Sequence, residues 1–516
     1  MVMSSATGSS TSARRRRPGV HADHPNYCWW VLSVTSLGMF LATVNSGTLL
    51  IALPNLERAL HTSLLTLVWV ILAYMVASTV LLLPAGRLAD QIGRKRLYVL
   101  GMAVFTFASF GAGFADSGTQ LIIWRVVQGV GGALIFANAG ALVTDVFPRE
   151  RLGLAMGTNV MVAAVGLVIG PVLGGWLVTY GWAWIFWFNV PLGLIGVVWS
   201  WLVLHETVGR DKQQQLDWWG NILMLVGLTG LVLGLSDAGL AGWTAPMVII
   251  GLTAGVVCLP IFVWVESKVP APMLDLSLFR IRIYSASAAA AFLNGLARFA
   301  LMFLFVFYFQ GPQREDPITA GLELAPLAIG MLVASPLAGA YADRKGSRFP
   351  AVLGMLLTAA GLAGMTTLQV DSPFWQSAIW LSIVGIGSGI FNSPNTSAMM
   401  AAVPPWRRGI ASGTRVMLQN TGAVISIALM LMIVTATVPT LLLFSIFSGL
   451  TTGLSASKLA PFMSGMHAAL WILVGFSLLG ALVSALRGNA VVPTEQVIAA
   501  SPASEQAVDQ VARPVG

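Results

Sequence analysis

The chain has 516 residues, of which 56% are hydrophobic and only 9% are charged, and its mean hydropathy is +0.81. A soluble domain does not need so apolar a composition to form a core. Two cysteines and five scattered histidines exclude a disulfide framework and a metal cluster, and there is no phosphate-binding loop, so we expect neither an enzyme nor a cofactor. We attribute the formal net charge of +8 to membrane topology, not to nucleic-acid binding.

Apolar runs of about twenty residues recur along the chain, and each can cross a hydrocarbon layer roughly 30 Å thick as an α-helix. The runs are continuous and lack the two-residue alternation of barrel strands, so the sequence predicts an all-α polytopic membrane protein. Fourteen spans are predicted, at approximately 29–53, 66–86, 97–115, 119–146, 153–178, 182–204, 218–236, 244–265, 285–309, 318–341, 349–368, 375–401, 409–436 and 466–486.

The composition between the spans divides the chain into parts. Both ends are polar and lack an apolar face, which indicates disorder. The expected parts are a cytoplasmic tail (1–28), a six-helix bundle (29–204), a linker with two extra transmembrane helices (205–284), a second six-helix bundle with a long outer loop (285–487, loop near 437–465) and a second cytoplasmic tail (488–516).

The distribution of lysine and arginine orients the predicted spans. With both termini in the cytoplasm, 22 of the 28 basic residues fall on the cytoplasmic side, three on the other side and three within spans. Such an excess is typical of the cytoplasmic loops of membrane proteins. We therefore expect a multi-pass membrane protein whose two ends are both cytoplasmic.

Two short patterns occur twice in the chain. Gly, Asp and Gly have the same spacing in GRLADQIGR, from Gly86, and in GAYADRKGSR, from Gly339, which lies 253 residues later. Pro, Gly and Gly recur in the same way from Pro148 and from Pro404, 256 residues apart. The similar offsets indicate two homologous six-span bundles with two further spans inserted between them. Paired repeats with a site between them are the usual build of a secondary transporter.

Together, these ordered motifs resemble those of the major facilitator superfamily and, within it, the fourteen-span drug:H+ antiporters. The resemblance covers residues 29 to 487 and implies the major facilitator fold and a bacterial plasma membrane. The motifs are a loop between spans two and three (GRLADQIGRKR, 86–96), a fourth-span motif (LIIWRVVQGVGGA, 121–133), a fifth-span antiporter motif (GLVIGPVLGGW, 166–176) and the landmarks LDWWG (216–220), PMLDLSLFR (272–280) and FYFQ (307–310).

The loop motif predicts a cytoplasmic gate. Gly86 and Gly93 permit a tight turn and a close approach of helices, and Asp90 can accept hydrogen bonds from a helix N-terminus or an arginine. The alternative is that these charges only hold the loop in the cytoplasm. With the matching positions of the second copy, the expected gate residues are Gly86, Asp90, Gly93, Arg94, Asp343 and Arg344.

The fifth-span motif predicts close helix packing. Gly166, Gly170 and Gly174 are four residues apart and share one helix face, while Gly175 follows and Pro171 removes one helical hydrogen bond. Ordinary small-residue packing is the alternative reading. By resemblance, the motif is associated with antiporters and therefore favours export.

Three arginines fall within predicted spans, where a charge is costly and indicates a functional role. Arg125 faces the bundle interior or, alternatively, reaches the outer surface; by resemblance it is implicated in proton transfer. Arg298 lies too deep to reach either surface easily, which favours a cavity or an ion pair. Arg415, with Gln419 one turn later, is either an interfacial anchor or a cavity residue.

A departure from the family pattern affects proton coupling. FLATVNSGTLLIALP (40–54) resembles the first-span motif, but Asn45 stands where the family has an aspartate, and an amide does not titrate. Glu323 is the exceptional acid predicted within a span, at a depth comparable to that of Arg298. The hypothesis is that Glu323 carries the proton and Arg298 sets its charge state. The alternative is a water-exposed Glu323 without function.

The leading hypothesis is a monomeric exporter of amphipathic or apolar small molecules that works by alternating access, coupled to protons. One alternative is a facilitative exporter of a single metabolite or lipid, since Asn45 cannot carry a proton. Another is a non-transporting sensor or scaffold. The expected cavity residues are Gln128, Phe136, Met161, Phe292, Phe303, Asn392, Arg415 and Gln419.

Overall fold

A computed structural model describes residues 24–206, 217–269, 272–403, 408–438, 442 and 456–488 of the protein. Within these ranges the chain is helical and has no strand, as the apolar runs predict. The predicted tails and the outer loop near 437–465 lie largely outside the described residues.

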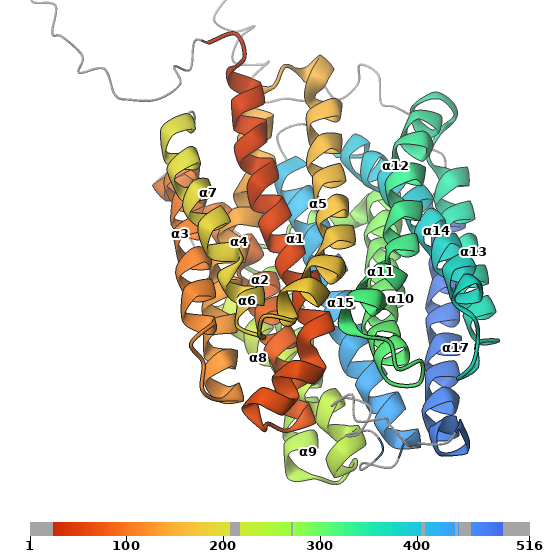
Figure 1. Ribbon diagram of the computed structural model, residues 1–516. Helices are drawn as coiled ribbons and strands as arrows, with labels where there is room; N and C mark the ends of the chain where they lie inside the picture. Colours follow the sequence, from red (N-terminus) through yellow and green to blue (C-terminus); the bar gives the residue numbers. More distant parts are fainter. Residues whose placement is uncertain are drawn as a thin grey trace, which may run out of the picture.

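Figure 1 labels the helices in the order in which they occur along the chain. They are α1 (Tyr27–Leu60), α2 (Leu64–Ile92), α3 (Arg94–Ala112), α4 (Gly118–Val146), α5 (Arg149–Val178), α6 (Trp184–Trp187), α7 (Asn189–Val203), α8 (Trp218–Ala241), α9 (Pro246–Glu266), the 3-10 helix η1 (Leu276–Arg280), α10 (Arg282–Gln310), α11 (Pro317–Glu323), α12 (Ala325–Lys345), α13 (Arg348–Met365), α14 (Phe374–Ala401), α15 (Arg408–Thr437) and α17 (Ala456–Leu486).

Among the described residues, 12 helical stretches are long and apolar enough to cross a membrane. The two remaining predicted spans correspond to α3 and α5. α3 has 19 residues and begins with three consecutive basic side chains, which leaves little uninterrupted apolar length. In α5, the apolar stretch among described residues is Ile169–Val178. Fourteen spans are therefore not confirmed by length and hydropathy alone.

Some helices differ from the predicted spans at prolines. α1 was expected to end before Pro54, but it continues to Leu60 and ends at His61, whose φ of 45° is left-handed. Neighbouring helices allow a transmembrane helix to accommodate a proline. Two predicted single spans are each divided into two helices, and the longer second helix begins close to Pro191 or Pro326. A proline suits the first turn of a helix because its missing amide needs no partner there.

The two halves of the chain repeat the same packing. α1 packs on α5 and α2 on α4, while α10 packs on α15 and α12 on α14. Gly166 lies against the carbonyl of Phe40, and Gly422 lies against the carbonyl of Phe292. These glycines are 256 residues apart in the sequence, the offset of the second repeated pattern. The same close contact therefore occurs once in each half.

The inserted helices α8 and α9 form a hairpin beside both halves. They pack on each other through small residues, since a Cβ on Gly230 would lie 2.9 Å from the carbonyl oxygen of Gly251. α8 also contacts α2 of the first half and α15 of the second half. This hairpin is thus placed to sense how the halves move against each other.

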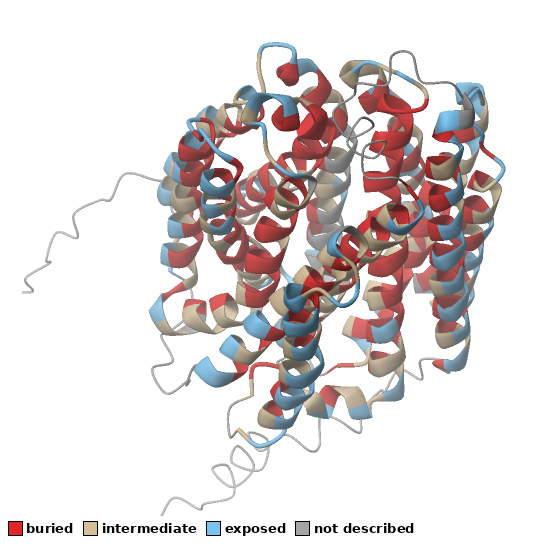
Figure 2. Ribbon diagram, turned by 90° about the horizontal axis from the view of Figure 1, so that it is seen from below, coloured by how far each residue is buried: buried red, intermediate tan, exposed pale blue. Residues whose placement is uncertain are grey.

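Buried residues gather in the middle of the bundle, and exposed residues lie mainly on its outer faces (Figure 2). In the most apolar window of α9 only 22% of the residues are buried inside the protein, whereas in α10 the share is 83%. α9 therefore leaves most of its surface for lipid, and α10 is a central helix whose polar groups have little access to the bilayer.

Candidate functional site

A buried polar network connects α1, α2, α3 and α4. Arg125 Nε donates to the carbonyl of Val70 at 2.9 Å, and its Nη1 donates to Gln128 Oε1. Gln128 Nε2 in turn donates to Asn45 Oδ1 at 3.1 Å and to Ser109 Oγ at 2.7 Å. The network places three residues singled out from the sequence, at positions 45, 125 and 128, in one site.

Arg125 lies inside the bundle. Its side chain is 1% exposed, and its guanidinium lies 4.5 Å from the ring centroid of Tyr74, a cation–π contact. The alternative in which Arg125 reaches the outer surface is therefore wrong. Neighbouring helices, which bring Val70 and Tyr74 to the guanidinium, hold the charge where it cannot snorkel.

Position 45 is surrounded by hydrogen-bond donors. Asn45 Oδ1 accepts from Gln128 and also from Asn189 Nδ2 at 3.4 Å. Asn45 Nδ2 and Asn189 Oδ1 are buried and have no hydrogen-bond partner. In the described structure, Arg125 makes no ion pair with a carboxylate. The site is thus built to receive an acceptor at position 45, and this chain supplies an amide oxygen without a charge.

Asn189 was missed in the sequence. It is fully buried at the start of α7, where its Nδ2 also donates to the carbonyl of Ile185 at 3.0 Å. A signal was available, since Asn189 interrupts the apolar run WIFWFNVPLG with a polar side chain. A buried amide needs a partner, and Asn45 provides it.

The pair expected between Arg298 and Glu323 is not formed. Arg298 Nη1 donates to Met331 Sδ at 3.6 Å, its guanidinium lies 4.6 Å from the Phe299 ring, and its Nε is buried without a partner. The charged groups that act on Glu323 are Glu315 and Asp316. Glu323 ends α11 beside this acidic loop, whereas Arg298 lies about three turns from the outer end of α10, so their depths differ.

The acidic loop before α11 fixes the start of that helix. Asp316 accepts hydrogen bonds from the amides of Ile318 and Thr319, and its Oδ2 accepts from the Thr319 hydroxyl at 2.5 Å. The hydroxyl bond, together with these amides, holds the pKa of the Asp316 carboxyl below its usual range. Asp316 is therefore a helix cap.

Two further arginines lie in the second half. Arg415 Nη1 donates to Gln419 Oε1 at 3.1 Å, and its Nε is buried without a partner. Arg487, which we had assigned to the cytoplasmic side, is 2% exposed, with Nη1 lying 3.3 Å from Asn395 Oδ1. Burial, and then the charge of Arg348, lowers the pKa of Arg487 to about 10. From the sequence alone, Arg487 is counted with the cytoplasmic C-terminal tail and not inside the bundle.

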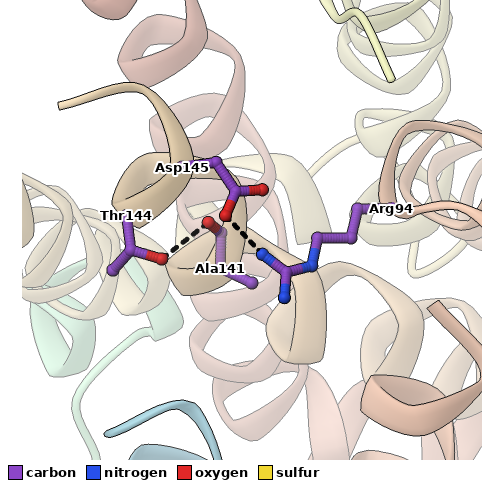
Figure 3. Close-up of polar contacts among 4 residues, drawn as sticks. All are labelled: Arg94, Ala141, Thr144 and Asp145. Carbon is purple, nitrogen blue, oxygen red and sulfur yellow. Dashed lines mark hydrogen bonds and ion pairs between the residues drawn. The ribbon is translucent and has the colours of Figure 1, made fainter. Parts of the chain in front are cut away.

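The gate segment joins α3 to α4 by an ion pair. Arg94 Nη1 lies 2.5 Å from Asp145 Oδ1, and Thr144 Oγ1 beside it donates to the carbonyl of Ala141 (Figure 3). Gly93 has a φ of +119° and lies against the carboxylate of Glu206, so a glycine is needed there.

Not every expectation for the gate is met. A Cβ on Gly86 would meet no atom within 4 Å, so the close approach expected there is wrong, because no neighbouring helix reaches this position. The side chains of Asp90 and Asp343 lie outside the described residues, while Arg344 is exposed.

The glycine face of α5 packs against the backbone of α1. A Cβ on Gly170 would lie 2.9 Å from Gly47 Cα, and a Cβ on Gly174 would lie 2.6 Å from Thr48 Cα. Gly175 lies against Pro317 of α11 in the other half, with a Cβ-to-carbonyl-oxygen distance of 2.3 Å. α5 therefore connects its own half to the second half at the ends of α5 and α11.

A second contact between the halves lies near that end. Gln310 Nε2 donates to the carbonyl of Ile51 at 3.2 Å, which joins α10 to α1. Gln310 ends the FYFQ motif, for which the sequence alone offered no role. Together with Gly175, Gln310 brings the two halves into contact at the ends where α1 and α10 finish.

The predicted cavity residues differ in how far they are buried. Phe136, Phe292, Asn392 and Gln419 are partly buried, and Met161 is 50% exposed. Phe303 is 3% exposed and packs edge to face on Phe307, so it belongs to the apolar core, and it also borders a small cavity that Met430 and Phe462 line with it. A residue type that suits a cavity also suits a core, and the sequence alone does not distinguish them.

Residues 35–427 match the Major Facilitator Superfamily. The chain belongs to this superfamily. It is therefore a membrane-embedded, multi-pass transporter, and no catalytic activity is indicated. The family membership favours transport over the alternative of a sensor or scaffold.

Characterised relatives and solved structures are similar over most of the chain. The tetracenomycin C resistance and export protein of Streptomyces glaucescens is 30% identical over 78% of this chain and 75% of its own length. The riboflavin transporter RibZ of Clostridioides difficile is 29% identical over 76% of this chain and 85% of its own length. A bacterial homolog of the human lysosomal transporter Spinster, crystallised inward-facing and unoccupied, shares the fold with a TM-score of 0.62. The two sequences are 16% identical, and the match covers 90% of this chain and 97% of the homolog.

Proposed function

We propose that this major facilitator transporter is a drug-type exporter of amphipathic or apolar small molecules, working by alternating access and coupled to protons. The observation that carries the proposal is the glycine face of α5. Gly170 and Gly174 allow backbone contact with α1, and Gly175 brings the same helix against α11 of the other half. A helix that contacts both halves through its backbone is suited to their rocking. The tetracenomycin C relative supports export.

The proposal includes fourteen spans with both termini cytoplasmic. α3 runs beside α4 and α7, and α5 runs beside α1 (Figure 1). Both helices therefore lie next to helices that are long and apolar enough to cross a membrane. In this topology the loop at 86–96 and its repeat at 339–348 lie on one side. A variant without Cys28 and Cys258, carrying a cysteine at the exposed Arg96 or Lys345, should react with an impermeant maleimide only in everted vesicles, and a cysteine at Arg58 only in right-side-out cells. Labelling of positions 96 and 345 from opposite sides contradicts the topology.

The alternative function is facilitative export of one metabolite. Asn45 favours it, because the network around Arg125 contains no titratable acid at that position. The riboflavin transporter among the relatives shows that this similarity also includes a transporter named for a single compound. Proton coupling then depends on an acid elsewhere, and Glu323 remains our candidate.

Proteoliposomes that contain the purified protein distinguish these functions. Efflux of ethidium, of a neutral dye and of riboflavin is measured with and without a pH gradient, with protein-free liposomes as the control. Efflux of several dyes that the gradient accelerates supports a proton-coupled drug exporter. Gradient-independent movement of one compound supports the facilitative alternative and overturns the leading proposal, as does the absence of any transport.

A further inference from the structure

Two carboxylates meet where the inserted hairpin begins and ends. Asp217 precedes α8 and accepts a hydrogen bond from the Gly220 amide through Oδ1 at 2.9 Å. Glu266 ends α9 and accepts a hydrogen bond from the Leu274 amide through Oε2 at 3.0 Å. Both side chains are buried, with 7% and 2% exposure. Hydrogen bonds thus hold one oxygen of each carboxylate in place.

The other oxygen of each carboxylate has no partner. Asp217 Oδ2 and Glu266 Oε1 are both buried without a hydrogen bond. Both face the same small space beside Gly220, because a Cβ on that residue would lie 2.5 Å from Asp217 Oδ2 and 3.0 Å from Glu266 Oε1. Buried polar atoms are rarely left without a partner, so two facing carboxylate oxygens indicate that a small positive species belongs between them.

Arg87 is the cation that acts on this pair. Its charge interacts with both Glu266 and Asp217, and Glu266 is also held by the backbone amides of Leu274 and Met273. Lys268, on the turn after α9, is exposed, and Asp275 accepts from the Ser277 hydroxyl. Two negative charges therefore meet one positive charge in a buried place. One additional proton makes the group neutral.

The same residues hold the linker between the hairpin and the second half. The Arg87 guanidinium donates to the carbonyl of Pro272, and Glu266 accepts from the amide of Leu274. Residues 272–274 are therefore fastened to α2 at one end and to α9 at the other. Arg87, Asp217, Glu266 and residues 272–274 are called the linker latch below.

We propose that Glu266 takes up a proton, which it donates as a hydrogen bond to Asp217 across the space beside Gly220, and that this proton opens the linker latch. The inference rests on the proposed transport cycle, since it assigns a control to the movement of the halves. With both carboxylates ionised, two negative charges hold Arg87 beside the hairpin. A proton taken up on one carboxylate oxygen removes one of those charges and forms a hydrogen bond to the other carboxylate. The attraction that holds Arg87 is then weaker, so α2 separates from the hairpin more readily.

The position of the hairpin explains how this opening reaches both halves. α8 packs on α2 and on α15, and the linker continues through η1 into α10. A change in how α2 is held at the linker therefore acts on one helix of the first half and on the first helix of the second. The inserted helices thus have a role in control, separate from the polar network at Asn45.

Spin labels on the full-length protein in nanodiscs test the proposal without any substrate. Labels are placed at exposed Ile92, which ends α2, and at exposed Arg280, which ends η1, after Cys28 and Cys258 are replaced by serine. Double electron–electron resonance measures their distance distribution between about pH 5.5 and about pH 8.5, because burial raises the pKa of a carboxyl group toward this range. We expect longer distances at the acidic end.

Variants then assign the effect to the linker latch. Glu266→Gln combined with Asp217→Asn keeps the acceptors for the Leu274 and Gly220 amides but removes the charges, so the long distances should occur at every pH. Arg87→Gln should do the same. Asp275→Asn removes a neighbouring acid of the same linker and should leave the pH response of the wild type. If the double variant does not fold, Glu266→Gln alone provides the comparison.

Two outcomes overturn the inference. One is a wild-type distance distribution that does not change with pH, and the other is a pH response that survives in the carboxylate variants. Neither outcome depends on efflux. A protein that shows the pH response but transports no dye would refute the proposed function and leave the linker latch standing, and active efflux without the response would do the reverse.

Discussion

Gln128 Nε2 donates to Asn45 Oδ1 at 3.1 Å, and Gln128 Oε1 accepts from Arg125, so a single side chain connects the buried charge of α4 to α1. Asn45 also accepts from Asn189. A carboxylate at position 45 would accept the same two hydrogen bonds and would supply the anion that Arg125 lacks. The surroundings of position 45 therefore suit an acid better than the amide they hold.

This relationship predicts that Asn45→Asp adds a titratable group to the cycle. A gradient of one pH unit supplies about 1.4 kcal/mol per proton, which corresponds to about a tenfold effect on accumulation. We expect dye efflux from proteoliposomes to respond more strongly to the gradient in Asn45→Asp than in the wild type. Asn138→Asp is the matched control, because Asn138 is fully buried on α4 but belongs to no contact with Arg125. An equal gain in the control contradicts a specific role for position 45.

Arg125 should be required for transport. Arg125→Gln removes the charge that contacts Val70, Tyr74 and Gln128, so we expect efflux to fall by about tenfold or more, which corresponds to at least about 1.4 kcal/mol. Arg58→Gln, at an exposed arginine near the end of α1, should transport normally. Chromatography in detergent checks that both variants fold. Normal efflux by a folded Arg125→Gln protein would assign this arginine to packing alone.

The glycine face of α5 predicts a steric effect. A side chain at position 174 would meet Thr48 backbone atoms at 2.6 Å, so Gly174→Val must push α1 away from α5. Overpacking of this kind costs about 1–3 kcal/mol. We expect a lower melting temperature and little efflux. Gly475→Val provides the comparison, because a Cβ on Gly475 meets no atom within 4 Å and the helix should keep its stability. A stable, active Gly174→Val protein would show that α1 and α5 tolerate separation.

Much of the fold follows from patterns that the sequence contains in one dimension. Continuous apolar runs predicted helices because membrane-spanning backbone must satisfy its own hydrogen bonds, and the offset between Gly166 and Gly422 appears again as one contact in each half. The breaks at Phe188 and Leu324 were missed, since hydropathy does not report where one helix stops and a second one starts. Pro191 and Pro326 marked both places.

The site was predictable where one residue carried its own signal. Arg125 and Asn45 were found because a charge inside a span and an amide in place of an acid are visible without neighbours. The linker latch was missed, because Arg87 and Pro272 are 185 residues apart and only the packing of α2 on the hairpin brings them together. The pairing of Arg298 with Glu323 failed for another reason: the span ends suggested a common depth, whereas Arg298 lies about three turns from the outer end of α10 and Glu323 ends the short helix α11.

The ion pair at the gate should couple α3 to α4. Arg94→Gln and Asp145→Asn each remove one partner of a contact whose side chains are 21% and 14% exposed. For a pair that water reaches, we expect a coupling free energy of about 1 kcal/mol in a double-mutant cycle of thermal unfolding. The exchanged pair Arg94→Asp with Asp145→Arg should recover part of it. Additive single effects would show that the contact does not hold the two helices together.

Glu323 remains the candidate for the transported proton, and its surroundings make the test sharper. The charges of Glu315 and Asp316 act on Glu323. Of these three acids, Glu323 is the one that lies within the predicted span, and Glu323→Gln removes its carboxyl group. We expect the pH gradient to accelerate dye efflux in the wild type and to lose that effect in Glu323→Gln, with downhill movement retained. Asp116→Asn is the control, because Asp116 is an exposed acid in a different loop, between α3 and α4. If gradient-driven efflux persists in Glu323→Gln, the proton moves on another group. In that case the Asp217 and Glu266 variants, measured in the same vesicles, become the next comparison.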